Sequence, residues 1–227
     1  MKIVFCLPGF DYSREFLMCW TELLVACHQR GHAVMVSQHF SSFVPFARAK
    51  CLGSDVMAGP DQKPFLGRVD YDVMMWIDSD VLFNPEMIFA LLMSPHPITA
   101  GLYIMEDNRH FAAVREWDAE YFKKHGNFEF LTAEAINQYR KQSGQRYMQV
   151  SYSGMGLMAI KKGVVEQLKY PYFHYALQRF DTGREDIPEI VEMCSEDVAF
   201  CRNLQDAGLR VMLDLEVRGG HQKRLTL

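Results

Sequence analysis

The sequence predicts an α/β fold, in which a mostly parallel sheet carries helices on both faces. One basis is Val73 to Ile77, an unbroken apolar run of the kind found in strands that are buried on both faces. A second is the alternation of short apolar segments with segments of helical periodicity over residues 1–105. Such alternation is typical of βα units, in which a helix connects two parallel strands. The 227-residue chain suits a single domain.

Strands and helices are expected to alternate through the first half. A strand over 3–7 precedes a helix that Ser13 caps and Gly31 ends, since a polar N-cap and a terminal glycine are common helix boundaries. A later helix over 85–93 has Asn84 as its cap. The other expected elements are strands over 33–36, 73–77 and 98–104, a short helix over 41–50 and a loop over 53–70.

The second half is less regular. Residues 106–149 are polar and aromatic, and we expect them to form a variable insertion beside the site, with helical stretches near 117–124 and 133–142. The other expected elements are strands over 147–152 and 156–160, a helix from Ser195 to Ala207 and an extended segment over 209–217.

Composition narrows the class of protein. Apolar residues make up 49% of the chain, charged residues 23%, and the formal net charge is −4. This is the balance of an ordinary soluble domain, and it gives no electrostatic reason to expect nucleic acid as a partner. No apolar stretch approaches the ~18 residues that span a bilayer, so any membrane association is expected to be peripheral.

The cysteines and the N-terminus favour a cytoplasmic location. Six cysteines are present without a C-x-x-C pair, and several lie in apolar segments. This pattern is typical of buried, reduced thiols, not of a disulfide frame or a zinc site. The first apolar segment ends at Pro8-Gly9, which is too early for a signal peptide.

Asp78-Ser79-Asp80 follows the apolar run directly and is the first candidate site. Residues two apart on extended backbone project to the same side, so both carboxylates could converge on one hard cation. The carboxyl end of a strand is also where ligands bind in open α/β sheets. The alternative is that two acids simply solvate the end of a strand, and the triplet alone does not separate these interpretations.

Ser195-Glu196-Asp197 opens the helix expected near the C-terminus, with Ser195 as its cap. Acids in a first turn stabilise any helix by ~0.3–1 kcal/mol each, which is a sufficient structural reason for them. The functional interpretation is that Asp197 acts as a general base toward an incoming hydroxyl. Glu185-Asp186 is a rival pair, but it lies in a segment flanked by glycine and proline.

Three further positions carry functional and structural alternatives. His221 follows Gly219-Gly220 and could be a third metal ligand or exposed polar surface. Lys223 could meet a phosphate or belong to a basic tail. Arg48, on the short helix, could contact a base or a phosphate, although a solvated side chain is favoured slightly.

Gly154-x-Gly156-x-x-Ala159 formally fits a dinucleotide-binding fingerprint. A strand-like run follows these glycines where the fingerprint needs a helix, so we reject that interpretation. The glycines are instead expected to let the chain pass close beneath a ligand.

Taken in order, these motifs resemble the GT-A fold, DxD-containing, metal-dependent nucleotide-sugar glycosyltransferases. The resemblance runs over nearly the whole chain apart from 106–149. The motifs that carry it are the N-terminal βα unit, Asp78-Ser79-Asp80, Asn84-Pro85-Glu86, Thr99 to Tyr103, Ser153 to Gly156, Ser195-Glu196-Asp197 and Gly220-His221. The fold implied is a Rossmann-like, mostly parallel nucleotide-binding sheet with a smaller acceptor-side region.

The resemblance implies a role for each site residue. Asp80 would coordinate Mn²⁺ or Mg²⁺, Asp78 would contact both the metal and the ribose, and His221 would be the third metal ligand. Asp197 would be the catalytic base, with Glu196 orienting the acceptor or the base. The donor-binding positions implied are Leu7, Pro8, Gly9, Arg48, Asp78, Ser79, Gly154 and Lys223. Ala49-Lys50 follows Arg48 where many members have asparagine, which weakens a base-binding role for Arg48.

The implied reaction moves a hexose or deoxyhexose from a UDP- or GDP-sugar to a hydroxyl on a glycan, a lipid-linked or a glycoprotein acceptor, by inversion. Residues 1–105 would bind the nucleotide sugar, and residues 106–227 would form the acceptor side. One alternative is a HAD-type phosphohydrolase with Asp78 as its nucleophile, although its nucleophile strand usually comes first in the domain. The other is a non-catalytic nucleotide- or carbohydrate-binding module.

Overall fold

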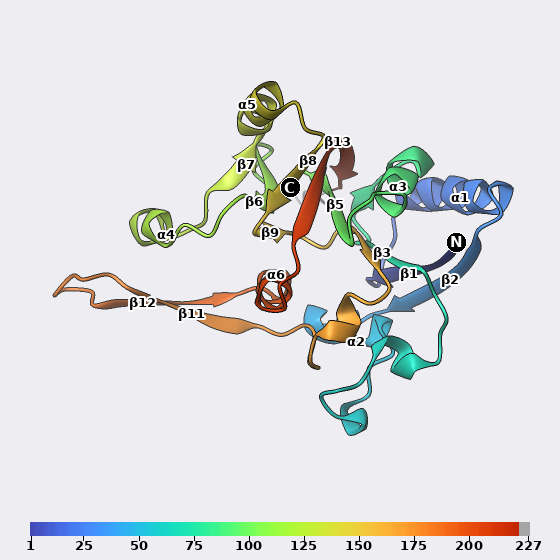
Figure 1. Cartoon of the computed structure of the whole chain (residues 1–227), viewed down its shortest axis with the longest axis horizontal. Helices are drawn as coiled ribbons and strands as arrows, with labels where there is room; N and C mark the ends of the chain where they lie inside the picture. The colour runs from blue at the N-terminus through green and yellow to red at the C-terminus, as the bar shows by residue number, and fades with distance from the viewer. Residues whose placement is uncertain (223–227) are drawn as a thin grey trace.

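The computed structural model describes residues 1–222 and is built around an eight-stranded mixed sheet (Figure 1). Its strand order is β2-β1-β3-β10-β5-β13-β4, and β8 also pairs with β13. The strands are β1 (Lys2–Pro8), β2 (Ala33–His39), β3 (Val73–Ile77), β4 (Val81–Leu82), β5 (Ile98–Tyr103), β8 (Tyr147–Val150), β10 (Leu157–Lys161) and β13 (Val211–His221).

Most of the central sheet is parallel in direction, as predicted. β1 runs parallel to β2 and β3, and β13 runs parallel to β5. β10 is antiparallel to both β3 and β5, so those two strands share one direction across it. The sheet therefore has one dominant strand direction, with β4, β8 and β10 opposed to it.

Helices cover both faces of this sheet, because alternate residues of its central strands enter two different apolar clusters. Ile3 and Phe5 pack into a cluster with α1 and α3, whereas Val4 and Cys6 pack into the opposite cluster, to which α2, α5 and α6 contribute. The helices are α1 (Arg14–Gln29), α2 (Val44–Cys51), α3 (Pro85–Leu92), α4 (Ala119–His125), α5 (Ala133–Ser143) and α6 (Glu196–Asp206). The predicted α/β class is confirmed.

Two predicted helix starts are formed by side-chain caps. The Ser13 hydroxyl accepts a hydrogen bond from the Phe16 N–H at 2.9 Å, and the Asn84 side chain accepts one from the Met87 N–H at 3.0 Å. Each bond satisfies an N–H that the first turn of a helix leaves without a partner. The expected loop over 53–70 contains a short 3₁₀ turn, Val56–Ala58, and a turn over Pro64–Gly67 in which Phe65 and Leu66 have positive φ.

Two small β structures were not predicted from the sequence. β7 (Phe130–Thr132), β6 (His110–Val114) and β9 (Tyr152–Ser153) form a three-stranded sheet, in that spatial order. β11 (Ala176–Asp181) and β12 (Glu189–Cys194) form a hairpin that projects from the body in Figure 1.

The segment expected as an insertion is tied into the main sheet at its end. β8 lies within 106–149 up to its last residue and pairs antiparallel with β13. The division of the chain into donor and acceptor halves stays a prediction.

The cysteines and the helices agree with simple expectations from composition. All six cysteines are free thiols, and five of them are buried. No helix within residues 1–222 combines the length and the apolar character needed to cross a bilayer.

Candidate active site

The Asp78-Ser79-Asp80 turn lies at the carboxyl end of β3, in the interior of the sheet. All five residues of β3 are buried. The Asp78 N–H donates to the Gly156 carbonyl at 3.1 Å, and the Val81 N–H donates to the Asp78 carbonyl at 3.1 Å. These backbone bonds fix the turn between β3 and β4, so the two acids are held in a defined place.

Arg48 is the side chain that joins this turn to α6. Its Nη1 and Nη2 donate to the two carboxylate oxygens of Asp78 at 3.1 and 3.2 Å, and its Nε donates to Glu196 Oε1 at 3.1 Å. Its side chain is only 3% exposed, so the slightly favoured expectation of a solvated arginine was wrong. No local pattern indicates these partners, because they are 30 and 148 residues away along the chain.

Glu196 and Asp197 lie in the first turn of α6, where the sequence placed them. Glu196 is buried and Asp197 is half-buried. Ser195 is the N-cap residue, but its side chain makes no capping hydrogen bond. The side-chain cap expected there is therefore absent, and the two acids are the polar side chains of this turn that face the interior.

The electrostatics of the site show how closely these groups interact. Burial raises the pKa of Asp197 to about 6; Arg48 opposes the shift, and the charge and hydrogen bond of Glu196 add to it. Burial also raises the pKa of Asp78, against the effect of Arg48. Burial alone would lower the pKa of Arg48, but Asp78, Asp197 and Glu196 outweigh it, so the pKa is raised and the guanidinium stays charged.

Asp80 and His221 meet on the other side of the turn. His221 Nε2 lies 3.0 Å from Asp80 Oδ2, and His221 Nδ1 lies 2.6 Å from the Ile104 carbonyl oxygen. Gly219 and Gly220 let β13 pass close to β4, since a Cβ on Gly219 would lie 3.1 Å from the Leu82 carbonyl oxygen. What these two glycines approach closely is a neighbouring strand.

This pair has the chemistry of a partial site for a divalent cation. A carbonyl oxygen only accepts, so His221 Nδ1 must carry a proton, and Nε2 is the ring atom that could bind a cation shared with Asp80. A carbonyl behind the ring is the usual way to orient a metal-binding histidine. Residues 1–222 contain no group of three or more acidic, histidine or cysteine side chains placed to hold a metal.

The end of β1 lies against the Asp-x-Asp turn. The Gly9 N–H donates to the His39 carbonyl at 3.0 Å, at the end of β2. A Cβ on Gly9 would lie 2.8 Å from Cβ and Oγ of Ser79. The structure therefore brings Leu7, Pro8 and Gly9 to the same edge of the sheet as Ser79, and the donor-binding roles of these residues stay predictions.

Tyr103 is a site residue that sequence reasoning missed. A Cβ on Gly154 would lie 2.0 Å from the Tyr103 hydroxyl, and the Gly156 N–H donates to that hydroxyl at 3.2 Å. The Tyr103 ring also packs edge-on against His221, with centroids 5.4 Å apart. The space expected for a ligand beside Gly154 is filled by this side chain, so a contact between Gly154 and a donor stays a prediction.

The rival acidic pair is outside this cluster. Glu185-Asp186 lies in the exposed turn between β11 and β12, where Arg184 Nε donates to Asp186 Oδ1 at 3.0 Å. Lys223 lies outside the described residues. The rival acidic pair is exposed and its arginine partner lies in the same turn, whereas Glu196 is buried and bonded to Arg48 from a distant part of the chain.

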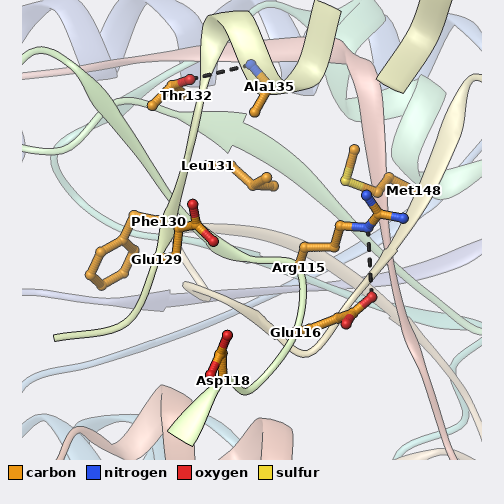
Figure 2. Close-up of a pocket in the computed structure, with 9 residues that line it drawn as sticks. All are labelled: Arg115, Glu116, Asp118, Glu129, Phe130, Leu131, Thr132, Ala135 and Met148. Carbon is orange, nitrogen blue, oxygen red and sulfur yellow. Dashed lines mark hydrogen bonds and ion pairs between the residues drawn. The ribbon is translucent and has the colours of Figure 1, made fainter. Parts of the chain in front are cut away.

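A separate pocket of about 370 Å³ lies in the region 115–148 (Figure 2). Figure 2 shows Arg115 and Glu116 side by side, 3.9 Å apart, with Asp118 and Glu129 on the other side of the cavity. The residues that line it are Arg115, Glu116, Asp118, Glu129, Phe130, Leu131, Thr132, Ala135 and Met148. None of these residues is a predicted site residue. The candidate site is therefore identified by the charged side chains that converge on Arg48, and not by this cavity.

No protein-family model and no curated protein sequence matches the chain. Among solved structures, A197 from STIV is similar at 15% identity and a TM-score of 0.51, covering 100% of this chain and 97% of that one. The catalytic domain of Drosophila beta1,4-galactosyltransferase 7 with xylobiose gives 11% identity, a TM-score of 0.49 and coverages of 98% and 71%. GalNAc-T7 with UDP, GalNAc and Mn²⁺ gives 13% identity and a TM-score of 0.49, covering 99% of this chain and 44% of that one. The similarity to A197 is one of fold.

Proposed function

We propose that the chain is a GT-A-type glycosyltransferase that moves a sugar from a nucleoside-diphosphate sugar, UDP- or GDP-linked, to an acceptor hydroxyl with Mn²⁺ or Mg²⁺. The observation that carries this proposal is the convergence of two acidic groups on one buried arginine. Arg48 holds Asp78 at the end of β3 and Glu196 at the start of α6, next to Asp197. Asp80 faces His221 on the other side of the same turn.

Asp80 and His221 are the residues that would hold the metal in this proposal, and Asp78 would contact the metal and the ribose. These three protein side chains would leave room for oxygen atoms of the diphosphate and for water, as is usual for Mg²⁺ sites. When bound, a divalent cation offsets the negative charge that develops on the departing diphosphate.

Asp197 is the proposed general base. Its carboxylate accepts the proton that the acceptor hydroxyl loses as its oxygen attacks the anomeric carbon of the donor sugar. A pKa of about 6 suits this role, because the group is ionised at neutral pH yet is a stronger base than an ordinary aspartate. One direct displacement of this kind inverts the anomeric carbon, and the acceptor would be a glycan, a lipid-linked sugar or a glycoprotein.

The HAD-type alternative fits this geometry less well. Both carboxylate oxygens of Asp78 accept hydrogen bonds from Arg48, and this lowers their availability as a nucleophile. β3 is also preceded by β1, α1, β2 and α2 in the chain. No observation favours the phosphohydrolase. Turnover of the donor would distinguish the proposed enzyme from a non-catalytic binding module.

The test combines nucleotide binding with turnover of the donor. UDP, GDP and their hexose conjugates are titrated with and without Mn²⁺, and release of nucleoside diphosphate is followed in the presence of a panel of acceptor sugars. The proposal expects Mn²⁺-dependent binding of one nucleotide and slow donor hydrolysis that an acceptor accelerates. Binding without any turnover would identify a binding module, and release of inorganic phosphate from simple phosphoesters would identify a phosphohydrolase.

A further inference from the structure

Arg48 connects two acidic groups that come from distant parts of the chain. Three of the five N–H bonds of its guanidinium are used, two toward Asp78 and one toward Glu196. The Arg48 and Glu196 side chains are 3% and 7% exposed. Because the guanidinium is planar and rigid, a shift that lengthens its bonds to Asp78 also changes its position relative to Glu196.

The side chains packed around Arg48 include apolar rings that cannot balance its charge. Its Cζ lies 5.8 Å from the ring centre of Trp76, which is fully buried. The Phe173 ring packs edge-on against the Trp76 ring, with ring centres 5.5 Å apart. A charged group in these apolar surroundings is stabilised chiefly by its carboxylate partners, with a smaller cation–π contribution from the Trp76 ring.

From this geometry we infer that Arg48 couples donor binding at Asp78 to the position of the Glu196 carboxylate and of the neighbouring base, Asp197. The inference rests on the proposed function and adds a positioning role that this function does not require. Arg48 acts here through other side chains, without a contact to the reacting atoms.

The physical reason is competition for one carboxylate. A donor that contacts Asp78 has to take up oxygen atoms that now accept bonds from Arg48 at 3.1 and 3.2 Å. The arginine charge is then balanced chiefly by Glu196 and Asp197, which draws the Glu196 carboxylate toward Arg48 and orders the first turn of α6 when the donor is present. Such a coupling is reciprocal. If nucleotide binding at Asp78 shifts the Glu196 carboxylate, then a change at Glu196 must in turn alter the affinity for the nucleotide.

The experiment measures nucleotide affinity in a variant that touches only the acceptor side. Glu196→Gln removes the charge from one partner of Arg48, so the guanidinium is held more strongly by Asp78 and competes better with the nucleotide. We expect the Kd of UDP or GDP, each titrated by calorimetry with Mn²⁺ present, to rise about fivefold or more. Glu22→Gln, on the exposed side of α1, is the matched control and should leave this Kd unchanged.

A second variant tests whether the effect passes through Arg48. Arg48→Lys keeps a charge but loses the planar fork, so Glu196→Gln added to it should change the nucleotide Kd by less than about twofold. If Arg48→Lys does not fold, as judged by circular dichroism, the comparison of Glu196→Gln with Glu22→Gln decides alone.

The outcomes separate the coupling from the function. A Kd in Glu196→Gln within about twofold of the wild-type value, with nucleotide binding intact, overturns the coupling and leaves the proposed function in place. An equal rise in Kd in the Arg48→Lys background also overturns it. Failure of the wild-type protein to bind either nucleotide with Mn²⁺ overturns both proposals.

Discussion

Asp197 illustrates how burial changes the acidity of one carboxyl group. Its pKa is raised to about 6, chiefly by burial, so the group is protonated below that pH and ionised above it. A protonated carboxyl cannot accept the acceptor's proton, so transfer should rise about tenfold per pH unit below pH 6 and level off above it. The pH dependence of kcat/KM measures this, and a rate independent of pH from 5 to 7 would contradict the base role.

Replacing Asp197 gives a paired prediction. Asp197→Asn should abolish acceptor-dependent transfer while Mn²⁺-dependent nucleotide binding persists, because the amide keeps the shape but cannot take a proton. Asp206→Asn, at the exposed end of the same helix, is the control and should leave the rate unchanged. Transfer by Asp197→Asn at a near wild-type rate would remove the assignment.

The same residue should affect stability with a definite sign. Its folded pKa lies above the ordinary value of 3.8, so between about pH 4 and pH 6 the folded state binds more protons than the unfolded state. The contribution of Asp197 to stability is therefore lost as pH rises through this window. When the pH is raised from 4.5 to 7, the Tm of Asp197→Asn should fall less than the Tm of the wild-type protein, and thermal melts at the two pH values measure this.

His221 and Asp80 carry a prediction about the metal. Because His221 Nε2 points at Asp80 Oδ2, His221→Ala should raise the Mn²⁺ concentration needed for nucleotide binding about tenfold or more. His125→Ala, on the exposed last turn of α4, should not change it. An unchanged Mn²⁺ requirement in His221→Ala would exclude this histidine as a ligand.

At the scale of elements, helix caps show what local sequence does and does not decide. Ser13 and Asn84 each accept an N–H of the first turn, so replacing either by alanine should lower the free energy of unfolding by about 1 kcal/mol. Ser195 has the same place in α6 without such a bond, and Ser195→Ala should cost clearly less. Urea unfolding of the three variants measures the difference; equal losses would show that Ser195 caps α6 in solution.

The β11–β12 hairpin is an element that only the surrounding structure explains. Its strands have no strong alternation of apolar and polar residues, and Phe180 holds it to the body by stacking on Phe122 with ring centres 4.4 Å apart. Strands of this kind depend on packing against neighbours, which local sequence patterns do not reveal.

Loss of that packing should free the hairpin. Phe122→Ala should speed cleavage in the exposed turn over 182–188 by a protease under native conditions, since local opening governs such cleavage. Phe46→Ala removes a ring that is 60% exposed and serves as the control. Equal cleavage rates in the two variants would show that the hairpin does not depend on Phe122.

At the scale of the whole molecule, a buried carboxylate helps to tie the region 106–149 to the central sheet. Asp214, on β13, is fully buried, and Arg146, just before β8, donates to it through Nη2 at 2.7 Å and through Nε at 3.0 Å. The strand register of β13 against β5 shifts immediately after Asp214. The pair therefore fixes the part of the sheet where β8 joins it.

Removing Arg146 should show how much this ion pair contributes to the free energy of unfolding. Arg146→Met leaves a buried carboxylate without its cation, and we expect the free energy of unfolding to fall by about 2 kcal/mol, less than for a fully buried pair because Arg146 is partly exposed. Arg179→Met breaks an exposed pair with Glu189 and should change it by less than about 1 kcal/mol. Chemical denaturation of both variants gives the comparison, and equal losses would contradict the argument.

The amino-acid sequence by itself determined the α/β class, the strand that ends at Asp78 and the position of Asp197 at the start of a helix. Those features depend on neighbours along the chain, through apolar runs, periodicity and helix-start residues. The tertiary structure decided which groups meet: Arg48 with Asp78 and Glu196, and His221 with Asp80 across 141 residues of chain. The physical reason is that a buried charge is stabilised by whichever opposite charge the fold brings near it, and the local pattern around Arg48 carries no record of that partner.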